Sequence, residues 1–436
     1  MSDPTSTSTR AAALPLLAGL VTQAGTTYLV LVLAGRSLGP VGFAALSSLY
    51  LLLTSVATGL FTPLEQEVTR RRGVERARRT WDDGLTRRAL THGLVAAALA
   101  IGLALAAYPV TVRTLGDRGW LVVALCLALP GYAAWFAVRG ELAGQGQLRR
   151  YGAQLVVDGV SRLVGAVVLV LADHASTAGF GLLFGLSPWV TLALTLPGWR
   201  LRPDDRTPGE RLPLTRPLAL LVLSALAAQL LINAGPLVVN LLASDAERDL
   251  AGVYLAVLVV VRIPVFLFTA VQPGYLRALS EHAGAGERRE FAHLVRRVLA
   301  PVLAATAVLC VAATALAPPL VSWLFDFDQE LSRTTCLLLT LAVGLFLVSV
   351  VLAQALLALG HHLWVTAGWL LGLAGLAAGT AVDNDVVTRA NTGLLCGAGV
   401  ATVALALLLA MEWNRTWPVP DATALTATDT GSRDGY

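Results

Sequence analysis

Long apolar segments separated by short polar ones make up nearly the whole chain. A transmembrane helix needs about 20 mainly apolar residues, and such runs recur twelve times along the 436 residues. They lie at 11–34, 42–64, 90–112, 119–138, 153–172, 179–199, 217–242, 250–272, 297–324, 334–358, 363–381 and 390–411. The pattern predicts an all-α, multi-pass integral membrane protein with about 12 transmembrane helices. Because the number is even, both chain ends are expected on the same side of the bilayer.

The arginines predict which side that is. All 32 basic residues are arginine. If the N-terminus faces the cytoplasm, 24 of them lie in inner segments, six in outer loops and two, Arg162 and Arg262, within spans. This bias predicts an N-in, C-in protein. The richness in alanine, leucine, glycine and arginine is typical of a bacterium with a GC-rich genome, so we expect the bacterial plasma (inner) membrane. The arginine clusters need no role beyond topology and attraction to anionic lipid.

A segment rich in proline and arginine separates the sixth predicted helix from the seventh. It indicates two six-helix lobes and a linker. The predicted parts are a polar N-terminal tail at 1–10, a lobe at 11–199, a cytoplasmic linker at 200–216, a second lobe at 217–411 and a disordered cytoplasmic tail at 412–436.

A weak internal repeat relates the two lobes. Shifting the chain by 210 residues places Gln23 on Asn233, Gly42 on Gly252 and Pro63 on Pro273. The first and seventh helices enter the membrane from the same side, so the repeats are parallel. Parallel repeats are a transporter arrangement in which the substrate site lies between the halves.

Polar side chains within the predicted spans concentrate on the helices that the repeat pairs. The candidate cavity residues are Gln23, Gln229, Asn233, Asn240, Arg262, Thr269 and Gln272. A guanidinium at the depth of Arg262 costs roughly 2.5–3.5 kcal/mol on insertion scales. We therefore expect Arg262 to face a hydrated cavity, whereas interhelical hydrogen bonds are an equal alternative for the amide side chains.

Roles are also predicted for other charged residues and for helix breakers. Asp158 and Arg162 are spaced i, i+4, so they form either a structural ion pair or a second charged patch. Glu65 and Glu67 follow Pro63 and are expected to cap a water-facing rim. Gating or structural roles are predicted for Gly42, Pro63, Glu65, Gly252, Pro264 and Pro273.

Enzymatic function is not indicated. The chain has no P-loop, HExxH or GxSxG motif, and its predicted outer loops are too short for a catalytic domain. Its four cysteines are isolated from one another, so neither a disulfide nor a metal site is expected. No cofactor and no nucleic-acid partner are predicted.

Two segments resemble a known family. GRSLGPVGFAALSSLYLLLTSVATGLFTPLEQEVTRR (35–71) and YLAVLVVVRIPVFLFTAVQPGYLRALS (254–280) are similar to the second and eighth helices of polysaccharide-biosynthesis membrane proteins. These proteins are the Wzx-like flippase branch of the multidrug/oligosaccharidyl-lipid/polysaccharide (MOP) exporter superfamily. The resemblance implies a MATE/MOP-like fold and export of a lipid-linked saccharide of the polyprenyl-phosphate type.

The resemblance also implies partners and roles. Arg262 lies in the shared motif and would meet a lipid phosphate, and glycosyltransferases or a polymerase of a polysaccharide pathway would be partners. Asp158 and Arg162 match no motif of the family. A cation-coupled small-molecule exporter of the same superfamily and a non-transporting scaffold of a polysaccharide assembly complex are the alternatives.

Overall fold

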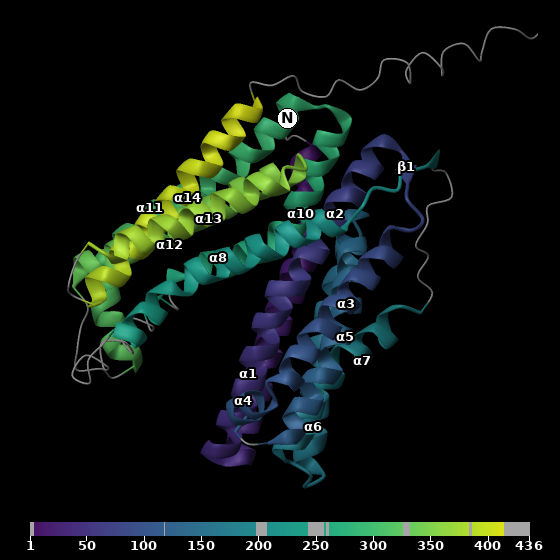
Figure 1. Cartoon of the computed structure of the whole chain (residues 1–436), viewed down its shortest axis with the longest axis vertical. Coiled ribbons are helices and arrows are strands. Elements are labelled where there is room, and N and C mark those ends of the chain that lie inside the picture. Colours follow the sequence, from purple (N-terminus) through teal and green to yellow (C-terminus); the bar gives the residue numbers. More distant parts are fainter. Residues whose placement is uncertain are drawn as a thin grey trace, which may run out of the picture. The chain divides into compact units, whose positions relative to one another are not determined.

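The computed structural model describes residues 4–116, 118–197, 207–242, 257–258, 261–325, 332–382 and 386–413. The structure is nearly all helical (Figure 1). Two compact units divide the chain. The first holds residues 1–72, 80–226 and 267–277, and the second holds 73–79, 227–266 and 278–436.

The first unit is built around α1 (Pro4–Val56), α5 (Gly119–Gly144), α6 (Leu148–Leu171) and α7 (Thr177–Thr195). Two further helices, α3 (Leu85–Ala106) and the short α4 (Tyr108–Thr114), precede α5. Glycines allow close crossing of α1 and α6: a Cβ on Gly159 would lie 2.2 Å from Thr26 Oγ1 and 2.9 Å from the Gln23 Cα. Small residues at such crossings are the usual means of packing helices in membranes.

α1 is one element from Pro4 to Val56, yet its neighbours show that the chain reverses direction within it. Gln23 lies beside Asp158 in α6, whereas Gly42 lies beside Thr177 at the start of α7, and Tyr50 lies beside Phe184. Because α7 returns antiparallel to α6, the two parts of α1 are antiparallel to each other. The sequence predicted two separate helices joined by a loop here. The structure keeps the two antiparallel spans but makes the connection helical.

Two helices continue well beyond the predicted apolar runs. The second span was expected to end near 64, but it passes through the π-helix η1 (Ala57–Phe61) into α2 (Thr62–Arg78). The helix that contains the end of the predicted span 250–272 also continues, because α10 runs from Ile263 to Ala285. Helical hydrogen bonding does not stop at the membrane surface, and polar residues can continue it in water. Pro63 and Pro273 therefore lie inside helices, and the wide turn of η1 accommodates the missing N–H and the ring of Pro63.

The predicted linker is partly anchored on the first unit. Thr207–Pro208 (β2) pairs in parallel with Thr80–Trp81 (β1), and the Gly209 N–H donates to the Trp81 carbonyl at 2.8 Å. Leu214 is buried in a small core with Leu64 and Val68 of the second span. We call residues 207–214 the connecting segment; they lead into α8 (Thr215–Leu242).

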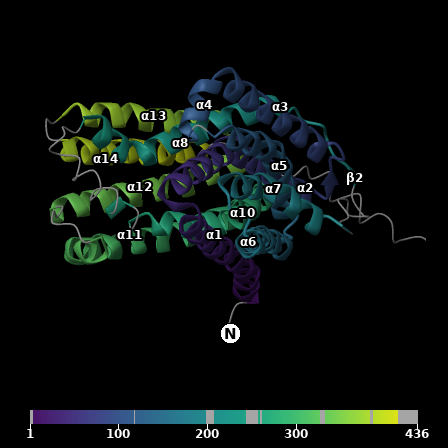
Figure 2. The same ribbon diagram turned by 90° about the horizontal axis from the view of Figure 1, so that it is seen from below.

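In the second unit, α11 (Arg288–Phe325), α12 (Arg333–Ala358), α13 (His362–Thr380) and α14 (Val386–Trp413) lie side by side (Figures 1 and 2). α12 is the most buried of them and packs against both α11 and α14. Ser332 caps the start of α12, where its hydroxyl accepts a hydrogen bond from the Thr335 N–H at 3.1 Å.

Eleven helices in the described part of the chain are long and apolar enough to cross a membrane. Each corresponds to one predicted span. The eighth predicted span, 250–272, is described at 257–258 and 261–272, and Gly252 lies outside the described residues. The all-helical, multi-pass fold class is thus confirmed, whereas the orientation of the chain ends and the bounds of the two lobes stay predictions.

Candidate functional site

A buried charge cluster lies in the membrane-spanning part of the first unit. Asp158 and Arg162, one turn apart on α6, form an ion pair, and both side chains are almost fully buried. Gln23 of α1 donates from Nε2 to Asp158 Oδ2 at 2.7 Å. The hydroxyls of Ser187 and Thr191 on α7 donate to the other carboxylate oxygen. We call these five residues the Asp158 cluster.

The Asp158 cluster satisfies its carboxylate completely. Each carboxylate oxygen accepts from two donors, which come from three different helices. The Arg162 guanidinium in turn lies 5.7 Å from the Phe184 ring centre. Asp158 is therefore both charge-balanced and fully hydrogen-bonded, and it ties α1, α6 and α7 together.

A second polar cluster lies in the second unit, around Arg262. Its Nη1 donates to Asn233 Oδ1 at 3.1 Å, and its Nη2 donates to the carbonyl of Ile232. The Asn233 amide donates to the carbonyl of Gln229 at 2.8 Å and to its Oε1 at 3.2 Å. Arg262 itself stands at a turn immediately before α10, whose second residue is Pro264. We call Gln229, Asn233 and Arg262 the Arg262 cluster.

The predicted cavity residues thus separate into groups. Gln23 belongs to the Asp158 cluster, whereas Gln229 and Asn233 belong to the Arg262 cluster. Two others lie on α10, where Thr269 is exposed and Gln272 is partly buried. The backbone of Asn240 continues α8, but its side chain lies outside the described residues.

The sequence predicted that Glu65 lies on a water-facing rim, but this prediction is wrong. Its side chain is buried and forms an ion pair with Arg139 at 3.2 Å, while Tyr151 donates to it at 2.6 Å. Arg139 also lies over the rings of Phe136 and Trp135 at 4.6 and 5.0 Å. Enclosure by α5 and α6 explains the burial. This glutamate joins three helices.

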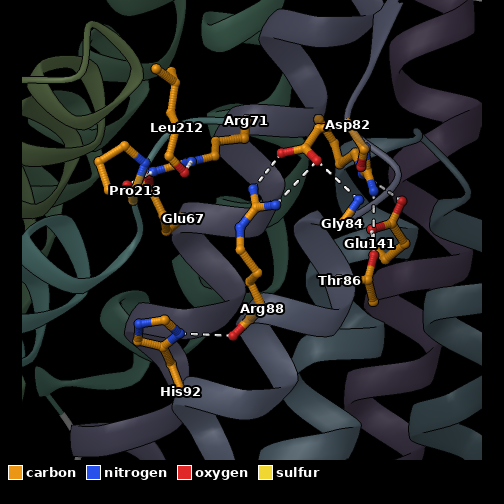
Figure 3. Close-up of polar contacts among 11 residues, drawn as sticks. Glu67, Arg71, Asp82, Gly84, Thr86, Arg88, His92, Glu141, Leu212 and Pro213 are labelled. Carbon is orange, nitrogen blue, oxygen red and sulfur yellow. Dashed lines mark hydrogen bonds and ion pairs between the residues drawn. The ribbon is translucent and has the colours of Figure 1, made fainter. Parts of the chain in front are cut away.

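A dense network of charges follows in α2 and its neighbours (Figure 3). Arg71 bonds Glu67 at 2.7 Å and donates to the carbonyls of Leu212 and Pro213 at 2.8 and 2.6 Å. Figure 3 shows these two carbonyls facing Arg71 from the connecting segment. Glu67 is fully buried, so it too is not part of a rim.

Arg72 forms another part of this network. It bonds Glu141 of α5 at 2.7 Å, and its guanidinium stacks 3.6 Å from the centre of the Trp81 ring. Thr86 donates to the same glutamate at 2.6 Å (Figure 3). Arg72 and Glu141 are almost completely buried. This arginine therefore serves internal packing, which corrects the expectation that the arginine cluster needs no role beyond topology and lipid attraction.

Asp82 closes the network outside the membrane-spanning segments. It accepts from the Gly84 N–H at 2.9 Å and forms an ion pair with Arg88 (Figure 3). Burial by itself would raise the pKa of this carboxyl. The hydrogen bonds from Arg88 and Gly84, with the charges of Arg88 and Arg72, outweigh that effect and hold the pKa of Asp82 below its ordinary value.

The predicted gating residues have mixed surroundings. Gly42 is buried, and a Cβ there would lie 2.9 Å from Leu38 and 3.2 Å from Thr177. Pro63 is buried directly after η1. The sequence pointed to Asp158, Arg162, Gln23 and Asn233 but missed Arg139 and Tyr151. The only local signal for the missed pair is that an arginine and a tyrosine occur near the ends of neighbouring predicted helices.

We compared the chain with known proteins. No family model matches the chain. Uncharacterized proteins of Mycobacterium tuberculosis and Mycobacterium bovis are each 26% identical over 413 residues, which cover 90% of this chain and 93% of theirs. These relatives have no described activity in their names.

Solved structures of transporters are similar over nearly the whole chain. A mutant of the MATE transporter VcmN of Vibrio cholerae has a TM-score of 0.73 at 15% identity, covering 93% of this chain and 99% of that one. A MATE in the bent conformation has a TM-score of 0.75 at 15% identity, covering 96% of each chain. A MOP superfamily transporter from Pyrococcus furiosus, whose binding pocket is described as having reverse polarity, has a TM-score of 0.69 at 14% identity, covering 92% of this chain and 94% of that one. The chain therefore has the fold of the MATE transporters, which belong to the MOP superfamily.

Proposed function

We propose that the protein is a transporter of the MOP superfamily that exports a lipid-linked, phosphate-bearing saccharide from the inner to the outer leaflet. The observation that carries the proposal is the Arg262 cluster. Arg262 is kept within an apolar stretch at a cost of a few kcal/mol. Two of its contacts, with Asn233 and Ile232 of α8, orient the guanidinium. A guanidinium held in this way can bind a phosphate through charge-assisted hydrogen bonds.

The Asp158 cluster also favours an anionic substrate. Its carboxylate is balanced by Arg162 on the same helix and fully hydrogen-bonded. A cation arriving there would have to displace the arginine. The charges described within the apolar segments, Asp158, Arg162 and Arg262, are thus better suited to an anionic substrate than to a cationic one. An inside-negative potential would favour outward movement of an anion by about 2.3 kcal/mol per charge per 100 mV fully crossed.

A cation-coupled small-molecule exporter is the second candidate. Its support is also Asp158, a buried carboxylate that joins three helices, together with the likeness to multidrug MATE transporters. In that mechanism the ion would compete with Arg162 for the carboxylate, and helix packing would change with occupancy. Asp158 would then be essential for transport in addition to stability.

The test of the first candidate compares Arg262→Gln and Arg262→Lys in the native bacterium. Export of surface polysaccharide should fall at least tenfold in Arg262→Gln at equal protein level and be partly retained in Arg262→Lys, because the lysine keeps the charge. Arg216→Gln, a change of an exposed arginine at the other end of α8, is the matched control and should leave export unchanged. Unchanged export in Arg262→Gln would remove the phosphate role. Tolerance of every substitution in both clusters would instead favour the scaffold alternative.

A further inference from the structure

An open cavity of about 580 Å³ lies in the second unit where α11 begins and α14 ends. It is lined by Arg289, Glu290, Ala292, His293, Arg296 and Trp413. Arg289, His293 and Arg296 are spaced i, i+4, i+7, so they share one face of α11. The lining therefore combines two arginines, a histidine and an indole ring with one acid.

Contacts between helix ends lie beside the cavity. Arg288 donates to the carbonyl of Trp413, and its guanidinium lies 4.2 Å from the centre of the Trp413 ring. Glu412 is bound to His361 at 3.1 Å, which joins the start of α13 to the end of α14. These contacts join the ends of α11, α13 and α14, so the backbone that carries Arg289 and Arg296 is positioned before any ligand arrives.

Apolar surface leads away from the cavity along both helices. On α11 the exposed residues include Leu303, Val308 and Val311; on α14 they include Val403, Leu407 and Met411. Both helices are candidate membrane spans, so this surface suits hydrocarbon. Basic side chains at one end of an apolar, membrane-facing helix are the combination that binds anionic lipid headgroups.

We propose that this cavity binds the phosphate headgroup of an anionic phospholipid, whose acyl chains lie along the exposed faces of α11 and α14. Arg289 and Arg296 pair with the phosphate, and Trp413 lies at the level of the headgroup. The proposal does not depend on the proposed transport function, because the site lies apart from the Arg262 cluster in the chain and uses none of its residues.

The test measures lipid retention by the full-length purified protein. In native mass spectrometry, protein equilibrated with equal amounts of dioleoylphosphatidylglycerol and dioleoylphosphatidylcholine should retain the former. Each arginine near a membrane surface contributes about fivefold in affinity, so Arg289→Gln/Arg296→Gln should bind phosphatidylglycerol about 25-fold more weakly. Both side chains are exposed, so the variant should fold normally. Arg289→Lys/Arg296→Lys should retain most of the binding because the charge is kept.

The matched control is Arg149→Gln/Arg150→Gln, which removes two exposed arginines at the start of α6. Retention should change less than twofold. Equal losses in both double variants would mean diffuse charge attraction and overturn the proposal. Displacement of the lipid by inorganic phosphate at the same concentration would reveal a site for free phosphate instead. A chain ending at Trp413 that binds the lipid more than tenfold more tightly would make residues 414–436 the natural occupant.

Discussion

Replacing Asp158 by asparagine tests whether the Asp158 cluster is a structural ion pair. Arg162 cannot lose its proton in a protein, so Asp158→Asn leaves a buried guanidinium without its carboxylate. Only 1% of Asp158 and 5% of Arg162 is exposed, so water cannot compensate. Removing one partner of such a pair lowers the free energy of unfolding by about 3–5 kcal/mol.

Replacing the arginine of the pair instead should lower the free energy of unfolding less. In Arg162→Leu the donors from Gln23, Ser187 and Thr191 to the carboxylate remain. We therefore expect a smaller loss, of about 1–3 kcal/mol, the cost of a poorly satisfied buried polar group. The double variant Asp158→Asn/Arg162→Leu contains no charge, and it should recover most of the stability lost in Asp158→Asn.

Equilibrium unfolding in mixed micelles measures these differences as a double-mutant cycle. The partly exposed ion pair Arg76–Glu281, at 3.1 Å, supplies the matched control, and Glu281→Gln should change the free energy of unfolding by less than about 1 kcal/mol. If Asp158→Asn is as stable as the wild type, the reasoning is refuted. A stable double variant without transport would instead favour the cation-coupled alternative.

Further predictions concern α2, its surroundings and the crossing of α1 with α6. Arg71→Ala removes two hydrogen bonds to the connecting segment, so limited proteolysis within 207–214 should accelerate at least threefold, while Arg87→Ala, an exposed neighbour, should not change it. The folded-state pKa of Asp82 is lowered, so its stabilising contribution is complete above the ordinary pKa of 3.8 and is lost as the pH falls through the lowered value. The difference in free energy of unfolding between wild type and Asp82→Asn should therefore be constant from pH 7 to about 5 and shrink below 3.8; a difference that grows in acid would contradict this. Gly159→Leu should separate α1 from α6 and lower the yield of folded protein, whereas Gly102→Leu, which has open space around it, should not.

The length and number of the apolar segments were sufficient to predict the fold class, because a chain in lipid must satisfy its backbone hydrogen bonds within helices. They could not predict where helices end outside the lipid. α2 continues to Arg78 and α10 to Ala285 because charged residues support a helix in water as well as apolar ones do in the membrane. They also did not predict the anchoring of the connecting segment, since that depends on Arg71 meeting carbonyls some 140 positions away.

Local spacing explains which site residues were found. Asp158 and Arg162 are one helical turn apart, so their ion pair could be expected from the sequence alone. Arg72 and Glu141, or Glu65 and Tyr151, meet only because α2 packs against α5 and α6. No periodic pattern in the sequence encodes such contacts. From the sequence alone, an arginine that forms them cannot be distinguished from one that only determines membrane topology.

The most direct test of the proposed function is transbilayer movement of a lipid-linked saccharide in proteoliposomes. Purified protein would be reconstituted with a fluorescent polyprenyl-diphosphate saccharide, and a membrane-impermeant quencher would report the fraction in each leaflet. The account predicts protein-dependent movement that falls at least tenfold in Arg262→Gln and persists in Arg216→Gln. Movement at the wild-type rate in Arg262→Gln, with both proteins folded and equally reconstituted, would contradict it.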